Sequence, residues 1–150
     1  MKLMVVLLLT VCSFSVSRAQ CDVEVREAFG GVSSITVYNT YITIGAIADA
    51  YVNEVYNANR VKELMSEQTS MLQSVIDMLS KCQVAKSNGL SADDVVYIKE
   101  LITCLNSLKA EAQGLSDFAV SGSEEAQKRY NQNRDKAWGE ISALLGLAEE

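Results

Sequence analysis

Apolar residues recur every seven positions along the middle of the chain. One row consists of Ile44, Tyr51, Ala58, Met65, Leu72 and Leu79, and a second row, three positions further on, consists of Ile47, Val61, Val75 and Cys82. Glu54 and Gln68 interrupt the second row. The spacing predicts one amphipathic helix over residues 35–87 with coiled-coil character. Two polar stretches, residues 57–60 and 66–70, are the places where this helix could bend or break.

Helix start and stop signals divide the rest of the chain. Asn88-Gly89 ends the first helix, because glycine adopts a left-handed conformation without strain. Ser91 and Asp94 have the spacing of a capping box and predict a second helix over residues 92–120. The stretch from Ser121 to Glu124 then interrupts the chain before a third predicted helix over residues 123–148.

The predicted fold is all-α. Short connections make neighbouring helices antiparallel, so we expect an elongated helical hairpin with a third helix packed alongside, a three-helix bundle. A continuous first helix would be about 80 Å long, roughly twice the length of the others. Residues 35–59 therefore either fold back onto the bundle, which we favour, or protrude with an exposed apolar stripe.

The N-terminus has the pattern of a secretory signal peptide over residues 1–19. A basic start, a short apolar run and the small-x-small sequence Ser17-Arg18-Ala19 form this pattern. Residues 20–34 would form an N-terminal segment before a helical domain over residues 35–150. We expect an exported protein of the periplasm, cell surface or extracellular space, without a transmembrane segment in the mature chain. Lipid attachment at Cys21 is the alternative to soluble export.

Charge and composition exclude several classes of function. Loss of Lys2 and Arg18 would leave 11 basic residues against 19 acidic ones, a net charge of −8, which argues against nucleic-acid binding. The chain has no histidine, so it lacks the commonest general base and the usual zinc ligand. We therefore expect neither an enzyme nor a protein with a cofactor or metal.

Three cysteines would remain in the mature chain. In an oxidising compartment, one disulfide and one leftover cysteine are expected, and we predict the pair Cys82–Cys104. Its geometry requires the first helix to end early, near Ser80, because Cys104 lies about 18 Å into the second helix.

Two groups of residues are candidates for protein contact. Four tyrosines fall within 19 residues of the first helix, and aromatic residues are enriched at interfaces: Tyr38, Tyr41, Tyr51 and Tyr56. A local basic run on this acidic chain is a candidate docking patch for an acidic partner: Lys128, Arg129, Arg134 and Lys136. For both groups, core packing or a solvated helix face is the simpler interpretation.

The helical pattern resembles that of periplasmic TrbJ-type conjugal-transfer proteins of type IV secretion systems, which are related to minor pilins. The resemblance is carried by Ile47, Asp49, Tyr51, Val52 and Asn53, by Asn88, Gly89, Leu90, Ser91 and Asp94, and by a basic tail-like run over residues 127–146. It implies an all-helical subunit that contacts secretion or pilus subunits, or further copies of itself. The alternative hypothesis is a stand-alone periplasmic helical module with a binding or chaperone-like role.

Overall fold

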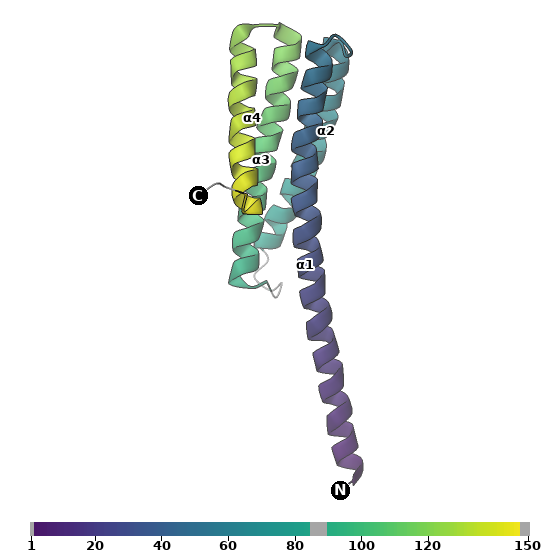
Figure 1. Ribbon diagram of the computed structural model, residues 1–150. Helices are drawn as coiled ribbons and strands as arrows, with labels where there is room; N and C mark the ends of the chain where they lie inside the picture. The colour runs from purple at the N-terminus through teal and green to yellow at the C-terminus, as the bar shows by residue number, and fades with distance from the viewer. Residues whose placement is uncertain (1, 85–89, 148–150) are drawn as a thin grey trace. The chain divides into compact units, whose positions relative to one another are not determined.

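The computed structural model describes the backbone of residues 2–84 and 90–147, and the side chains of residues 25–82 and 90–147. Four α-helices account for the regular structure of these residues: α1 (Lys2–Val52), α2 (Ala58–Val84), α3 (Ala92–Ser121) and α4 (Glu124–Leu145) (Figure 1). The prediction of an all-α fold is confirmed. The predicted helix stop at Asn88-Gly89 lies outside the described residues.

The chain divides into two compact units, residues 1–35 and residues 36–150. In the first unit the chain is helical from Lys2, and its described apolar side chains Val25, Phe29, Val32 and Ile35 are exposed. Within the part of the chain that the structure describes, no helix combines the length and the apolar character needed to cross a membrane. The predicted signal peptide stays a prediction.

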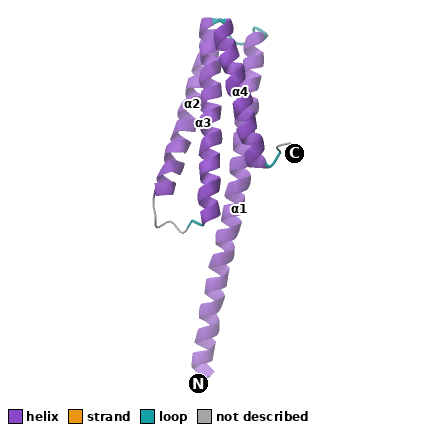
Figure 2. Cartoon of the chain, turned by 90° about the vertical axis from the view of Figure 1, so that its left-hand side faces the viewer, coloured by secondary structure: helices purple, strands orange, loops and turns teal. Residues whose placement is uncertain are grey.

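The second unit is an up-and-down bundle of four helical segments. The part of α1 from Thr36 to Val52 and the helices α2, α3 and α4 alternate in direction, as Figures 1 and 2 show. Helix α3 packs against both α2 and α4. Short turns join consecutive helices at residues 53–57 and 122–123, which makes these neighbours antiparallel.

The prediction of one unbroken helix over residues 35–87 was wrong. Helix α1 ends at Val52, and the chain turns back before α2 begins at Ala58. Glu54 adopts a left-handed conformation with a φ of 61°. The Val55 amide donates to the Ala50 carbonyl at 2.8 Å, and the Glu54 amide donates to the Tyr51 carbonyl at 3.0 Å. This is the Schellman pattern that closes a helix, with glutamate at the position where glycine is usual.

The turn also starts α2. The Asn57 side chain accepts a hydrogen bond from the Arg60 amide at 2.9 Å, which caps the first turn of the helix. The polar stretch over residues 57–60, one of two places where the helix could bend or break, overlaps this turn only at Asn57, since α2 begins at Ala58. The break divides the predicted hairpin and third helix into four helices, and residues 36–52 fold back onto the bundle.

The ends of α3 are fixed by local sequence. The predicted capping box is confirmed: the Asp94 amide donates to Ser91 Oγ at 3.1 Å, and the Ser91 amide donates to Asp94 Oδ2 at 2.7 Å. The helix ends at Gly122, whose φ of 61° places it in the left-handed region that glycine favours. Ser123 caps α4 through its side chain.

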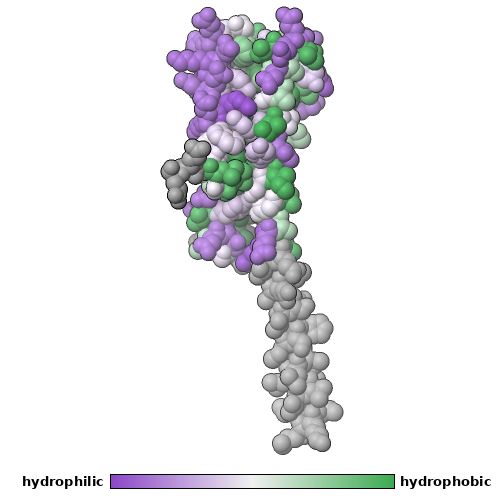
Figure 3. Space-filling view, viewed as in Figure 1, coloured by the Kyte–Doolittle hydropathy of each residue, from purple (hydrophilic) through white to green (hydrophobic). Residues whose placement is uncertain are grey.

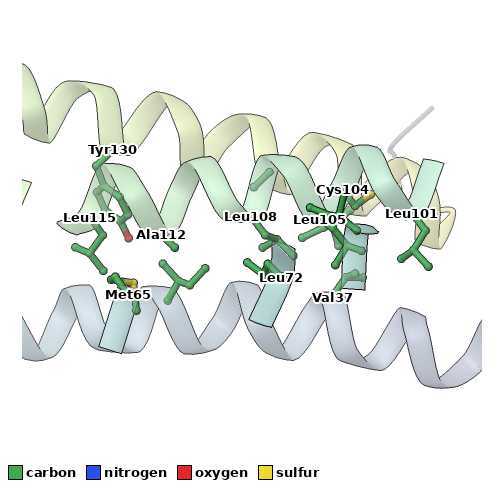
Figure 4. Close-up of a cluster of buried hydrophobic side chains, with 14 of the residues drawn as sticks. Val37, Met65, Leu72, Leu101, Cys104, Leu105, Leu108, Ala112, Leu115 and Tyr130 are labelled. Carbon is green, nitrogen blue, oxygen red and sulfur yellow. The ribbon is translucent and has the colours of Figure 1, made fainter. Parts of the chain in front are cut away.

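The core of the bundle lies along the inner face of all four segments. Figure 4 shows side chains of α3 pointing toward α2 and α1, among them Leu105, Leu108, Ala112 and Leu115 facing Val37, Met65 and Leu72. The first heptad row of the sequence supplies part of this core, because Ile44, Met65, Leu72 and Leu79 are buried. In the second row Val61 is buried, but Val75 and Cys82 are exposed.

Candidate functional site: the aromatic and charged cluster of α1, α3 and α4

Three aromatic side chains form a surface where α1 lies beside α4. The Trp138 ring lies 5.4 Å from the Tyr41 ring and 6.4 Å from the Tyr38 ring, measured between centroids. Tyr38 and Trp138 are each 40% exposed, and Ile42 beside them on α1 is also exposed. We call Tyr38, Tyr41, Ile42 and Trp138 the aromatic surface. It combines large apolar area with polar groups, which is the composition of protein contact sites.

The face of the molecule drawn in Figure 3 has two regions that differ in hydropathy. In Figure 3, hydrophilic residues are frequent at the end of the bundle that holds the turns α1–α2 and α3–α4, with apolar residues between them. Apolar and near-neutral residues gather further along α1 and α4. Tyr38 and Ile42 lie about three to four helical turns before the end of α1.

Arg134 lies directly behind the aromatic surface. Its guanidinium carbon is 4.2 Å from the centroid of the Tyr41 ring, in the arrangement of a cation–π contact. Gly45, one turn along α1, allows this approach: a Cβ added to Gly45 would lie only 2.6 Å from Arg134 Nη2. A glycine at position 45 therefore lets the flat guanidinium lie against the backbone of α1.

The charge of Arg134 is matched by a buried carboxylate on α3. Arg134 Nη1 donates to Glu111 Oε1 at 2.7 Å, and Glu111 has no exposed surface. Burial raises the pKa of Glu111 to about 7, although Arg134 beside it acts in the opposite direction. Glu111 Oε2 has no hydrogen-bond partner among the described residues. The pair is a polar contact between α3 and α4 that runs from the buried Glu111 to Arg134, whose side chain is 29% exposed.

Tyr130 completes the cluster on α4. Burial raises its pKa to about 12, and the positive charge of Arg134 nearby opposes that rise. Beside it lies a recess of about 230 Å³, lined by Gly45, Ala48, Asp49, Val52, Phe118, Gln127, Tyr130, Asn131 and Arg134. The recess thus combines one basic, one acidic and several amide side chains with apolar walls.

The structure separates the four predicted tyrosines into two pairs. Tyr38 and Tyr41 belong to the aromatic surface, but Tyr51 packs at the other end of the bundle. Its hydroxyl donates to the Ala119 carbonyl at 3.1 Å, and its ring meets Phe118 edge-on at 5.5 Å. Tyr56 also packs partly against the core. Tyr51 and Tyr56 therefore hold the bundle together, as the simpler interpretation of the sequence had it.

The predicted basic patch of four residues is not formed. Arg134 faces inward to Glu111, whereas Lys128, Arg129 and Lys136 are exposed. At about 100° per residue, position 134 lies on the opposite side of α4 from positions 129 and 136. The exposed side also carries Glu125, whose carboxylate lies 3.7 Å from Arg129. What remains is a solvated face of mixed charge.

The predicted disulfide is also absent. Cys104 is a free, buried thiol that donates to the Glu140 carbonyl at 3.3 Å, and Cys82 is exposed on α2. Because α2 continues to Val84, Cys82 lies close to the end of its helix while Cys104 lies about 18 Å into α3. The two cysteines therefore lie too far apart along the helix axes to be joined by a disulfide. Burial raises the pKa of Cys104 to about 11, so this thiol is not a reactive one.

Sequence reasoning missed Glu111 altogether. A signal was present, since Glu111 lies between Leu108 and Leu115 at the spacing of core positions. A charge in such a position needs a buried partner, and Arg134 holds the matching place between Tyr130 and Ala137 on α4. The role of Gly45 could not be seen without the packing of α4.

Neither a cluster of metal ligands among the described residues nor a similarity to known proteins points to a function. Among the described residues, no three Cys, Asp or Glu side chains gather closely enough to hold a metal ion. No protein-family model matches the sequence, and no curated protein matches it significantly.

Proposed function

We propose that this chain is an exported bacterial protein that acts by protein–protein contact through its aromatic surface. The observation that carries the proposal is the half-exposed grouping of Tyr38, Tyr41 and Trp138. Binding energy in protein interfaces concentrates in Trp, Tyr and Arg side chains. Tyr41 is already fixed from behind by Arg134, so a partner would lose little side-chain freedom in binding it.

The setting that we propose is a conjugative type IV secretion or pilus apparatus. The signal-peptide pattern of residues 1–19 supports export. The resemblance to TrbJ-type proteins supports an assembly role, and its carrier residues Asp49 and Tyr51 lie on α1 within the bundle. A rigid four-helix bundle with an aromatic side fits a subunit that works by contact rather than by catalysis.

The test is site-specific cross-linking in the native envelope. A photoreactive amino acid at Tyr38 should link the tagged protein to secretion-channel or pilus subunits, identified by mass spectrometry. The matched control carries the same group at Val96, an exposed apolar position on α3 away from the aromatic surface. Linking of the same subunits from both positions, or of none from Tyr38, would contradict the proposal.

A second candidate function is a stand-alone periplasmic module for binding or chaperoning. The recess of about 230 Å³ beside Arg134 and Tyr130 supports it, because small ligands bind in partly apolar hollows with a few polar groups. This candidate predicts a monomer without cross-linked subunits. Its ligand would be detected as a rise in Tm that Arg134→Lys reduces.

A further inference from the structure

Helix α2 carries a second, mostly apolar stripe on the flank beside its buried face. Its buried stripe consists of Val61, Met65, Leu72, Ile76 and Leu79, which face the core of the bundle. The outer stripe consists of Leu64, Gln68, Met71, Val75, Met78 and Cys82; its last four residues are exposed, whereas Leu64 and the polar Gln68 are half-buried and Leu64 also packs against the edge of the core. Met71 is 57% exposed and Met78 is 58% exposed. An apolar stripe at this exposure is not required by the bundle itself.

The spacing of the outer stripe is that of a coiled-coil seam. Its positions alternate by four and three residues over almost three heptads, from Leu64 to Cys82. This seam is separate from the aromatic surface, which lies on α1 and α4. We propose that it is the contact through which a second copy of this chain pairs, α2 against α2, in antiparallel orientation around a two-fold axis.

The spacing of the stripe favours one alignment of the two copies along their helix axes. In an antiparallel coiled coil, residues of the two seam rows face one another across the contact. One register pairs all six positions of the stripe. It sets Leu64 opposite Cys82, Gln68 opposite Met78, and Met71 opposite Val75, each pair occurring twice by symmetry. A two-fold axis requires such self-complementarity, and the stripe has it.

Charge complementarity selects the same register. The residues that flank the stripe on its solvent side at the same heptad position are Glu67, Ser74 and Lys81. In the register above, Glu67 of one copy lies beside Lys81 of the other, twice, and the two Ser74 side chains meet at the axis. A parallel pair would instead set Glu67 level with Glu67 and Lys81 level with Lys81. Opposite charges on a seam set partner choice and orientation.

The first test is the mass of the full chain in solution against concentration, by light scattering. We expect dimers, and we expect Met78→Glu to give monomers because it places two carboxylates in the seam. The matched control is Val96→Glu, an equally exposed apolar residue on α3, which should leave the dimer intact. A monomer for the unchanged protein at all concentrations, or a dimer that Met78→Glu does not affect, overturns the proposal.

A charge exchange tests the register. Glu67→Lys should weaken the dimer about tenfold, and the double change Glu67→Lys with Lys81→Glu should restore it. Circular dichroism of each variant separates a lost contact from a lost fold. Failure of the double variant to recover would count against the antiparallel pairing.

A directed disulfide gives the decisive readout. In a Cys21→Ser background, Leu64→Cys should form a bond between copies with Cys82. Within one copy these positions are about 27 Å apart along α2, so the bond cannot be internal. Met71→Cys, which faces Val75 in the proposed register, should not cross-link. Efficient Cys82–Cys82 linkage would show a parallel pair instead.

Discussion

Two arginines five residues apart on α4 have opposite environments. Arg134 bonds at 2.7 Å to a carboxylate that is completely buried, whereas Arg129 lies 3.7 Å from Glu125, whose side chain is 83% exposed. Both belong to one basic run in the sequence. The difference arises from helix geometry, since about 140° of rotation separates the two positions.

The two arginines show that a run of basic residues in the sequence need not form a basic surface in the folded protein. On the solvent side, water screens the ion pair of Arg129, which contributes little. On the inner side, Arg134 is the counter-charge for Glu111, and it also contacts the Tyr41 ring and the backbone at Gly45. Arg134, whose side chain is 29% exposed, therefore connects three helices and supports the aromatic surface from behind.

The largest expected effect is the loss of the buried partner. Arg134→Ala should lower the free energy of unfolding by about 3 to 5 kcal/mol at pH 8, because the buried Glu111 carboxyl loses its hydrogen-bonded counter-charge and must either stay charged without a partner or take up a proton in the core. Arg129→Ala should change it by less than about 1 kcal/mol. Urea denaturation of both variants measures the difference.

A double replacement sharpens this comparison. Replacing both members of the buried pair by apolar residues, Glu111→Leu with Arg134→Met, should recover most of the loss, because no uncompensated charge remains. If the double variant is as unstable as Arg134→Ala, the loss comes from packing rather than from the unpaired carboxylate.

The next largest effect is the contribution of Glu111 to the pH dependence of the free energy of unfolding. Its pKa is about 7 in the folded protein, against an ordinary value of 4.5. Between these values the folded state binds a proton that the unfolded chain has released, so stability falls as pH rises through this window. The full change is about 3 kcal/mol. Raised pKa values keep Tyr41 and Tyr130 neutral there, and Arg134 stays charged.

The measurement is the free energy of unfolding at pH 5 and pH 8 for the unchanged protein and for Glu111→Gln. The other carboxylates contribute to both proteins, so the difference between the two pH dependences isolates Glu111. Equal dependences would contradict the assignment of the raised pKa to this group.

The sequence predicted the helical class and the starts of α3 and α4, but not the turn at residues 53–57. The heptad row through Ile44, Tyr51, Ala58 and Met65 keeps its phase across that turn, so periodicity could not reveal it. Neither glycine nor proline marks the place. The local signals were the interruption of the second row at Glu54 and the polar stretch that begins at Asn57, and Glu54 is the residue with the left-handed conformation.

The candidate site was predictable only where its residues look unusual in the sequence. Tyr38 and Tyr41 were found because aromatic residues are recognisable without a structure. Their contacts with Trp138 and Arg134 depend on how α1 lies on α4, which no local pattern encodes. The predicted pair Cys82–Cys104 failed for a related reason, because the rotation and height of two helices decide whether their side chains meet.

The smallest expected effect concerns two glycines that differ in what surrounds them. A Cβ at Gly45 would lie within 2.9 Å of three guanidinium atoms of Arg134, whereas a Cβ at Gly139 on α4 would meet nothing within 4 Å. Gly139→Ala should therefore stabilise the protein by about 1 kcal/mol through helix propensity. Gly45→Ala should destabilise it by about 1 to 2 kcal/mol, because Arg134 must move away from Glu111 and Tyr41.

Thermal unfolding of both glycine variants, each made also in the Arg134→Ala background, separates the two causes. Without the guanidinium, the added methyl group at position 45 has nothing to displace. Gly45→Ala should then become neutral or stabilising, while the effect of Gly139→Ala stays the same. If Gly45→Ala destabilises both backgrounds equally, the glycine serves the backbone of α1 and not the seating of Arg134.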